Sequence, residues 1–137
     1  MATILFIDDE DLMRTVFQVA LEKEGYRVLT AESGPHGLRL LQHQEVDLAL
    51  VDIFLPGMDG LEVIELLHMT RPACKIIALS GSSPEWDYLD TAKRLGSNAT
   101  LKKPFSLQDL LDAVASQLNE DHPHELTHVF DPRFRLT

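Results

Sequence analysis

Five short apolar runs alternate with longer amphipathic stretches along the 137 residues of this chain. Such alternation is typical of repeated strand–helix units, in which parallel strands form a sheet and helices cover its faces. The runs are almost continuously apolar, as expected for strands that are buried on both sides. The predicted strands are residues 4–7, 27–30, 48–51, 75–79 and 99–101. The pattern therefore predicts an α/β fold with a parallel sheet.

Between the runs, apolar residues recur at the helical spacing of three and four. The clearest sets are Leu12, Val16, Val19 and Ala20; Leu61, Ile64 and Leu67; and Leu107, Leu110, Leu111, Val114 and Leu118. The fourth helix is expected over about residues 84–95, where the apolar spacing is least regular. The sequence thus predicts one helix after each strand.

Short polar motifs mark where these helices begin and end. Ser33 and Ser83 each lie shortly before a proline that can occupy a first helical turn. Ser106 has an acidic residue three positions later, which predicts a capping box. Gly25 and Gly96 stand where helices should end.

The regular pattern ends after Leu118, and the remaining residues have no clear period. A length of 137 residues and a hydrophobic content of 45% suffice for one continuous core. We therefore expect one domain over residues 1–118 and a C-terminal tail or linker over residues 119–137. The apolar residues of the tail could dock on this domain or on a partner.

Composition argues against several classes of protein. The net charge of −10 repels the phosphates of nucleic acids, so direct nucleic-acid binding is not expected. The apolar runs are far shorter than the roughly 20 residues of a membrane-spanning helix, and the N-terminus does not resemble a secretory signal. Cys74 is the single cysteine, which agrees with a reducing compartment. We expect a cytoplasmic protein without membrane attachment.

Polar side chains follow four of the five predicted strands. The first strand is followed by Asp8, Asp9 and Glu10, and the third by Asp52. The fourth and fifth are followed by residues 80–82, which include two serines, and by residues 102–104, which include two lysines. Ligands of open α/β sheets bind beyond the carboxyl ends of the strands. We therefore expect acids, hydroxyls and a cation to meet at one edge.

Three carboxylates at one edge repel one another, and at least one pKa rises unless a cation shares the site. Mg²⁺ suits a small set of oxygen ligands that leaves room for water and phosphate oxygens. Asp8, Asp9 and Asp52 are therefore the predicted metal ligands.

Asp52 stands alone after its strand, whereas Asp8 and Asp9 are adjacent and resemble a metal clamp. A carboxylate can attack phosphorus and form an acyl phosphate, so Asp52 is the predicted phosphoryl acceptor. Ser80 can donate a hydrogen bond to a phosphoryl oxygen, and a lysine can neutralise another. The residues alone do not distinguish Lys102 from Lys103.

Four segments carry a resemblance to a known family: residues 4–10, 47–60, 78–81 and 101–105. In this order and spacing, the chain resembles the receiver domain of bacterial two-component response regulators over about residues 3–118. The resemblance implies a flavodoxin-like, doubly wound sheet of five parallel strands in the order 2-1-3-4-5, with five helices.

The resemblance also implies the roles of individual residues. Asp52 would accept a phosphoryl group from a sensor histidine kinase or a histidine phosphotransfer protein. Asp9 and Asp52 would contact Mg²⁺ directly, with the backbone carbonyl of Phe54 as a further ligand and Asp8 acting through water. The matching lysine is Lys103, whose bond to the next proline is expected to be cis.

The output expected from such a domain is an altered surface, commonly residues 84–118 here. That surface would bind a downstream protein or an effector domain outside this chain, or form a homodimer. The chain would be a signalling switch with self-catalysed phosphotransfer and autodephosphorylation, and not an enzyme. Thr100 stands where the family often has the aromatic residue that reports phosphorylation, so the usual relay is in question.

Three other functions remain as alternatives. A degenerate receiver that works without phosphate is disfavoured because the acids, Ser80 and Lys103 are all present. A phosphatase of the aspartyl-phosphate type needs a second acid two residues after the nucleophile, where this chain has Phe54. A flavin-binding protein is disfavoured because Asp8 and Asp9 would repel the flavin phosphate.

Overall fold

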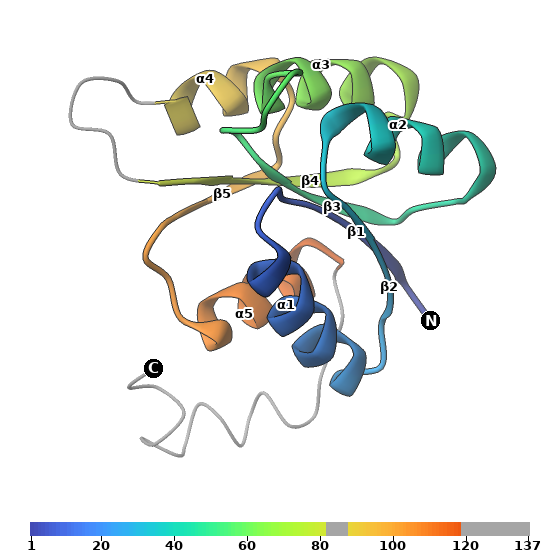
Figure 1. Cartoon of the computed structure of the whole chain (residues 1–137), viewed down its shortest axis with the longest axis vertical. Helices are drawn as coiled ribbons and strands as arrows, with labels where there is room; N and C mark the ends of the chain where they lie inside the picture. Colours follow the sequence, from blue (N-terminus) through green and yellow to red (C-terminus); the bar gives the residue numbers. More distant parts are fainter. Residues whose placement is uncertain (82–87, 119–137) are drawn as a thin grey trace.

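The computed structural model describes residues 1–81 and 88–118 and shows a five-stranded parallel sheet. The strands are β1 (Thr3–Ile7), β2 (Arg27–Ala31), β3 (Leu48–Asp52), β4 (Lys75–Ser80) and β5 (Ala99–Lys102). The helices are α1 (Asp11–Lys23), α2 (Gly34–His43), α3 (Gly60–Thr70), α4 (Tyr88–Leu95) and α5 (Leu107–Gln117). The strand order β2-β1-β3-β4-β5 confirms the predicted flavodoxin-like topology (Figure 1).

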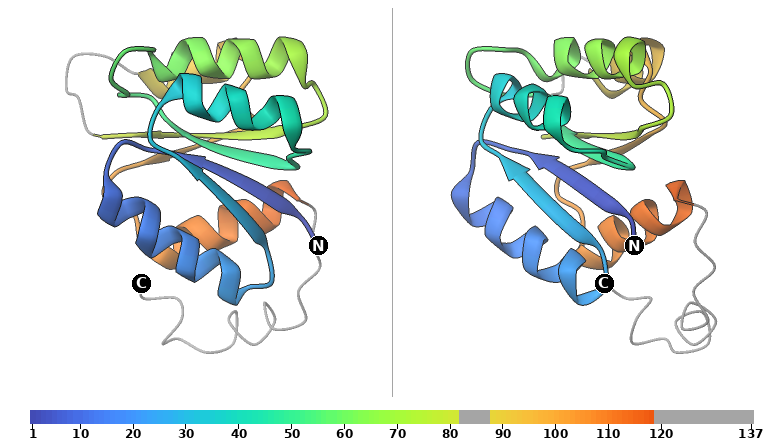
Figure 2. Two further views of the ribbon diagram at one scale, coloured as in Figure 1. Left: turned by 45° about the vertical axis from the view of Figure 1, so that its right-hand side comes forward. Right: turned by 90° about the vertical axis from the view of Figure 1, so that its right-hand side faces the viewer.

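The helices cover both faces of the sheet. Helices α1 and α5 lie on one face, and α2, α3 and α4 on the other (Figures 1 and 2). Successive side chains of a strand point to opposite faces, so β1 contributes to two cores. Ile4 and Phe6 pack with α1 and α5, whereas Leu5 and Ile7 pack beneath α2, α3 and α4. The central strands are therefore buried on both sides.

Most strands extend past their predicted ends into polar residues. Asp52, Ser80 and Lys102 are the last residues of β3, β4 and β5. Parallel pairing continues to these positions, since Asp52 lies opposite Leu79 and Ser80 lies opposite Lys102. Because these residues are polar, the sequence predicted that they follow the strands in loops. In the structure, pairing with the neighbouring strands keeps them extended. Three of the predicted site regions are consequently anchored directly by the sheet.

The predicted helix boundary signals are confirmed where they fall on described residues. Ser33 accepts a hydrogen bond from His36 N at the start of α2, and Ser106 forms the predicted capping box of α5. Gly25 and Gly96 have φ values of 94° and 125°, which only glycine adopts readily. The predicted start of the fourth helix near residue 84, with Ser83, lies outside the described residues.

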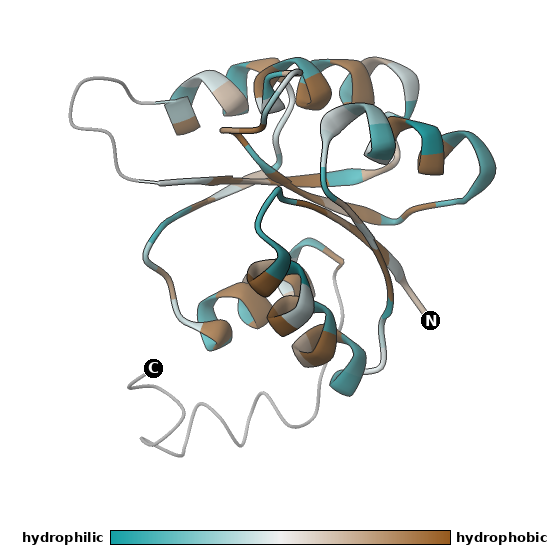
Figure 3. Cartoon of the chain, viewed as in Figure 1, coloured by the Kyte–Doolittle hydropathy of each residue, from teal (hydrophilic) through white to brown (hydrophobic). Residues whose placement is uncertain are grey.

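The apolar residues that predicted α1 are not the ones that attach it to the sheet. Leu12, Val16 and Val19 are 72%, 39% and 48% exposed. The buried residues of α1 are Phe17 and Leu21, four positions apart. The helix has apolar residues on more than one side, so spacing could not identify its inner face (Figure 3). None of the described helices has the length and apolar character needed to span a bilayer.

Candidate functional site

Asp8, Asp9 and Asp52 converge at the carboxyl edge of the sheet, as the sequence predicted. One carboxylate oxygen from each lies within 4.8 Å of the others. Asp8 is fully buried, Asp52 is 5% exposed and Asp9 is exposed. Asp8 Oδ2 is buried and accepts no hydrogen bond from any residue that the structure describes. A buried carboxylate oxygen without a donor, beside two further carboxylates, fits a hard divalent cation.

The other oxygens of these carboxylates are held by local hydrogen bonds. Asp52 Oδ1 accepts a bond of 3.0 Å from Phe54 N, and Asp8 Oδ1 accepts one of 2.9 Å from Glu10 N. Arg14 donates from Nη1 to the carbonyl oxygen of Asp8 at 2.6 Å. The sequence gives no indication of this role for Arg14, because nothing in the spacing distinguishes it from a surface residue of α1. These bonds fix the orientation of both buried acids.

The structure distinguishes the two lysines that the sequence left open. Lys102 ends β5 and is exposed. Lys103 places Nζ 3.0 Å from Asp52 Oδ2 and 3.6 Å from Asp8 Oδ2. Its backbone N donates to Ser80 O at 2.7 Å, and its bond to Pro104 is cis, as expected. Lys103 is therefore the cation of this site.

Ser80 lies at the same edge, at the end of β4, and is only 3% exposed. Its hydroxyl donates to the carbonyl oxygen of Gly81 at 2.9 Å. Rotation about one side-chain bond can redirect that hydroxyl to another acceptor. Ser82 lies outside the described residues. Thr100 is a half-buried residue of β5, opposite Ala78, and so occupies an ordinary strand position.

The electrostatics of the site favour binding of a cation. Burial raises the pKa of Asp52 above its ordinary value, and the charge of Asp8 adds to this, although the bond and charge of Lys103 oppose it. For Lys103, burial lowers the pKa, but the bond and charge of Asp52 and the charge of Asp8 outweigh it, so the pKa is raised. One lysine therefore does not fully compensate the buried acids, and a divalent cation would.

Gly60 sets the shape of the loop that follows Asp52. Its backbone N donates to Ile53 O at 2.9 Å, and its Cα faces the end of β3. A Cβ built on Gly60 would lie 2.2 Å from Asp52 O and 2.6 Å from Ile53 Cα. Only a residue without a side chain allows this close approach. Gly60 ends the motif of residues 47–60, but the motif does not reveal why glycine is needed at this position.

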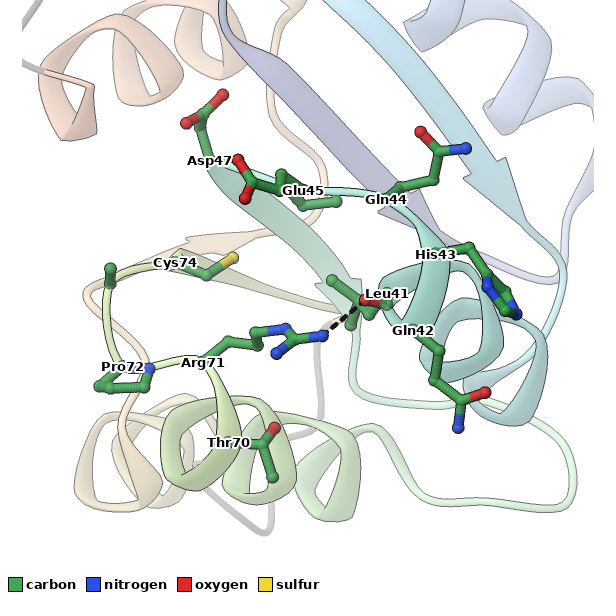
Figure 4. A pocket seen from close by; sticks show the side chains of 12 residues that line it. Leu41, Gln42, His43, Gln44, Glu45, Asp47, Thr70, Arg71, Pro72 and Cys74 are labelled. Carbon is green, nitrogen blue, oxygen red and sulfur yellow. Dashed lines mark hydrogen bonds between the residues drawn. The ribbon is translucent and has the colours of Figure 1, made fainter.

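A hollow of about 630 Å³ lies at the opposite edge of the sheet from the acidic site, where the strands begin. It lies between residues 41–47 and residues 70–74 (Figure 4). Arg71 Nη2 crosses this region and donates to Leu41 O at 2.7 Å, and Asp47 Oδ2 accepts from Thr3 N at 2.7 Å. Cys74 belongs to this region and is buried. These hydrogen bonds tie the residues after α3 to α2 and the residues before β3 to β1, and the hollow shares no residue with the acidic site.

Cys74 is expected to react slowly with alkylating reagents while the protein is folded. Burial, together with the charge of Asp47, raises the pKa of its thiol from 9.0 to about 11. Because the thiolate is the reactive form, its fraction at pH 8 falls by roughly 100-fold. Iodoacetamide labelling followed by intact mass should be at least about 100-fold slower in buffer than in concentrated urea. Equal rates would contradict the buried, protonated thiol.

Comparison with known proteins supports one family. A family model for the response regulator receiver domain matches residues 4–115. Sporulation initiation phosphotransferase F of Bacillus subtilis is 30% identical over 115 residues, which cover 84% of this chain and 92% of that protein. The alkaline phosphatase synthesis transcriptional regulatory protein PhoP of the same organism is 34% identical over 107 residues, 78% of this chain and 44% of that protein.

Solved structures show the same similarity. A CheY-like response regulator receiver domain protein from Methanospirillum hungatei has a TM-score of 0.82 and 32% identity, covering 87% of this chain and 94% of that one. The response regulator TrrA from Thermotoga maritima, in complex with Mg²⁺ and BeF, has a TM-score of 0.76 and 30% identity. The match covers 85% of this chain and 99% of that one. The chain covers 46% of a probable transcriptional regulatory protein of Picosynechococcus. This chain belongs to the response regulator receiver domain family.

Proposed function

We propose that this chain serves in phosphorelay signalling by accepting a phosphoryl group on Asp52. The observation that carries the proposal is the position of the Asp52 carboxylate. It lies at the end of β3, within 4.8 Å of two further acids, and 3.0 Å from Lys103 Nζ. A nucleophile beside a lysine ammonium and two further carboxylates that could hold a metal ion is suited to phosphoryl transfer.

In the transfer step, a lone pair of an Asp52 carboxylate oxygen forms a bond to the phosphorus of a phosphohistidine. The P–N bond breaks, and its electron pair remains on the imidazole nitrogen of the donor. Lys103 stays beside the site and balances charge on the phosphoryl oxygens. The Ser80 hydroxyl turns from Gly81 O to donate to a phosphoryl oxygen. The product is an acyl phosphate on Asp52.

Mg²⁺ would be held by Asp8, Asp9 and Asp52, with the backbone carbonyl of Phe54 as a further ligand. Asp8 Oδ2, which accepts no hydrogen bond from the described residues, and the raised pKa of Asp52 support this assignment. When bound, the ion neutralises negative charge on the phosphoryl oxygens. The chain would act as a switch and not as a phosphoester hydrolase, because Phe54 stands where a general acid would be needed.

The phosphoryl donor would be a cytoplasmic sensor histidine kinase or a histidine phosphotransfer protein. Its histidine must reach Asp52, so the donor must lie over the carboxyl edge of the sheet. The exposed apolar residues Leu12 and Val16 of α1, together with Phe54, provide a contact surface beside that edge. We further propose that residues 1–118 form the receiver and residues 119–137 a tail or linker. Residues 84–118 would bind a downstream protein, an effector domain or a second copy.

Leu12→Asp is expected to weaken transfer from the protein donor while leaving small-molecule phosphorylation unchanged. Leu12 is 72% exposed and does not contribute to the core, so the fold should tolerate the change. Placing a carboxylate against an apolar partner surface should cost more than about 1 kcal/mol, which is roughly fivefold in affinity. The rate should be measured with the cognate kinase and with acetyl phosphate. If the phosphorylation rate of Leu12→Asp falls equally with both donors, Leu12 does not act in docking the protein donor.

The proposed function is tested by incubating the full chain with Mg²⁺ and acetyl phosphate and measuring intact mass. The wild type should gain one phosphoryl group, and Asp52→Ala should gain none. Chelation of the metal should suppress the gain in the wild type. A gain that persists in Asp52→Ala, or no gain in the wild type, would contradict acceptance on Asp52.

Phe54→Asn is expected to shorten the lifetime of the acyl phosphate. The Phe54 side chain is 49% exposed and follows Asp52 by two residues, so it can limit access of water. A polar amide would admit and orient a water molecule, and we expect hydrolysis to be about tenfold faster, equivalent to about 1.4 kcal/mol in the barrier. The decay of phosphorylated protein should be followed by mass, with Phe54→Leu as an apolar control. Unchanged decay in Phe54→Asn would exclude this role.

A further inference from the structure

The ring of Phe54 makes an aromatic contact that connects the site to helix α4. Its centroid lies 5.0 Å from that of Tyr88, and the two rings meet edge to face at 80°. Phe54 follows Asp52 by two residues, and Tyr88 is the first residue of α4. The loop after the proposed phosphoryl acceptor is therefore in direct contact with the beginning of a helix on the same face of the sheet.

The backbone of Phe54 is hydrogen-bonded to the proposed phosphoryl acceptor. Phe54 N donates to Asp52 Oδ1, and Lys103 Nζ donates to Asp52 Oδ2. Formation of an acyl phosphate removes the carboxylate charge, which weakens its oxygens as hydrogen-bond acceptors. New phosphoryl oxygens then compete for the same donors. The backbone that carries the Phe54 ring would consequently respond to phosphorylation.

No other aromatic contact among the described residues offers such a route. Phe17 contacts Phe6 and Phe105, and both of these pairs lie on the side of α1 and α5. On the side of α4, the half-buried position in β5 is Thr100, which has no ring. Within residues 1–81 and 88–118, the contact between Phe54 and Tyr88 is thus the aromatic link from the acidic site to α4.

Helix α4 is the shortest of the described helices and packs against α3, β4 and β5. It has eight residues, and Ala92 is its one buried residue. Tyr88, Leu89 and Leu95 are half-buried and pack against the core beneath α2, α3 and α4. Because one small side chain among the described residues of α4 is fully buried and the three larger ones are half-buried, we expect a small shift of this helix to expose little apolar surface. If the contact between the rings of Phe54 and Tyr88 is lost or moved, the surface that α4 offers to a partner would therefore change.

We propose that Phe54 and Tyr88 transmit the phosphorylation state of Asp52 to α4, in place of a relay through position 100. The proposal rests on the proposed phosphorylation of Asp52. It assigns Tyr88 a role in transmission only, because the side chain belongs to α4 and not to the acidic cluster.

The test compares amide hydrogen exchange across α4 before and after phosphorylation with acetyl phosphate and Mg²⁺. The full chain is used as wild type, Tyr88→Leu and Tyr88→Phe, and intact mass gives the extent of phosphorylation of each. Leucine retains apolar bulk without the ring, whereas phenylalanine retains the ring. Tyr88→Leu should be phosphorylated normally, but its change in α4 exchange should fall by roughly 2- to 12-fold. Tyr88→Phe should respond as the wild type does.

The outcomes separate this proposal from the proposed function. An unaltered α4 response in Tyr88→Leu, or no α4 response in the wild type, overturns the coupling while leaving acceptance on Asp52 intact. Absence of a phosphoryl gain in the wild type overturns both. As a second variant, Phe54→Leu combined with Tyr88→Leu should reduce the response no further than either change alone. Additive losses would show that the two rings act independently, which contradicts the coupling.

Discussion

Lys103→Met should slow phosphorylation of Asp52 by acetyl phosphate by about 100-fold or more, the usual effect of removing one donor that stabilises developing negative charge. Lys103 Nζ lies 3.0 Å from Asp52 Oδ2, so it can balance charge on a transferring phosphoryl group. Methionine keeps the aliphatic stem and removes only the ammonium group. The initial rate of mass gain at saturating Mg²⁺ measures the effect directly.

Lys102→Met is the matched control for that measurement. Lys102 precedes Lys103 but is exposed at the end of β5, so its replacement should leave the rate within about twofold of the wild type. In the absence of metal, Lys103→Met should also be less stable, since it leaves Asp8 and Asp52 buried without a cation. Equal rates for the two lysine variants would show that Lys103 does not assist the transfer.

Gly60→Ala should destabilise the fold by about 3 kcal/mol, at the upper end of the cost of overpacking. The added Cβ would lie 2.2 Å from Asp52 O and 2.6 Å from Ile53 Cα. Both contacts are with backbone, which cannot rotate away as a side chain can. The end of β3 must therefore shift, and the shift would displace Asp52. Chemical denaturation in urea measures the change in the free energy of unfolding.

Gly81→Ala provides the control for Gly60→Ala. A Cβ on Gly81 meets no heavy atom within 4 Å in the described residues, and Gly81 also lies near the carboxyl edge of the sheet. Its replacement should change the free energy of unfolding by less than about 1 kcal/mol. If both variants lose the same stability, close approach of Gly60 to β3 is not what requires glycine there.

The residue pattern was sufficient to predict a parallel α/β fold and the residue types that meet at the site, whereas the strand order came from the family resemblance. Alternating apolar runs placed each strand, and the polar residues after them identified the edge at which Asp8, Asp9 and Asp52 meet. This succeeded because parallel strands deliver their carboxyl ends to one edge whatever the details of packing. Whether an individual oxygen accepts a hydrogen bond depends on atomic positions that no pattern of residue types encodes. Asp8 Oδ2, which accepts none from the described residues, is an example.

Other features depend on packing between segments that are distant in the sequence. The inner face of α1 could not be predicted because Leu12, Val16 and Val19 follow helical spacing as well as Phe17 does. Which of these residues is buried depends on how the helix packs on the sheet. The contact between Phe54 and Tyr88 joins residues more than thirty positions apart. Nothing in the sequence near either residue indicates that the two rings meet, so this contact could be found only in the structure.

The most direct test of the central claim is to locate the phosphoryl group on the chain. After phosphorylation with acetyl phosphate and Mg²⁺, borohydride reduces an aspartyl phosphate to homoserine, and peptide mapping then identifies the modified position. The account predicts homoserine at position 52 in the wild type, and none at Asp8 or Asp9. Modification at either of those acids, or none at Asp52 in protein that had gained a phosphoryl group, would contradict it.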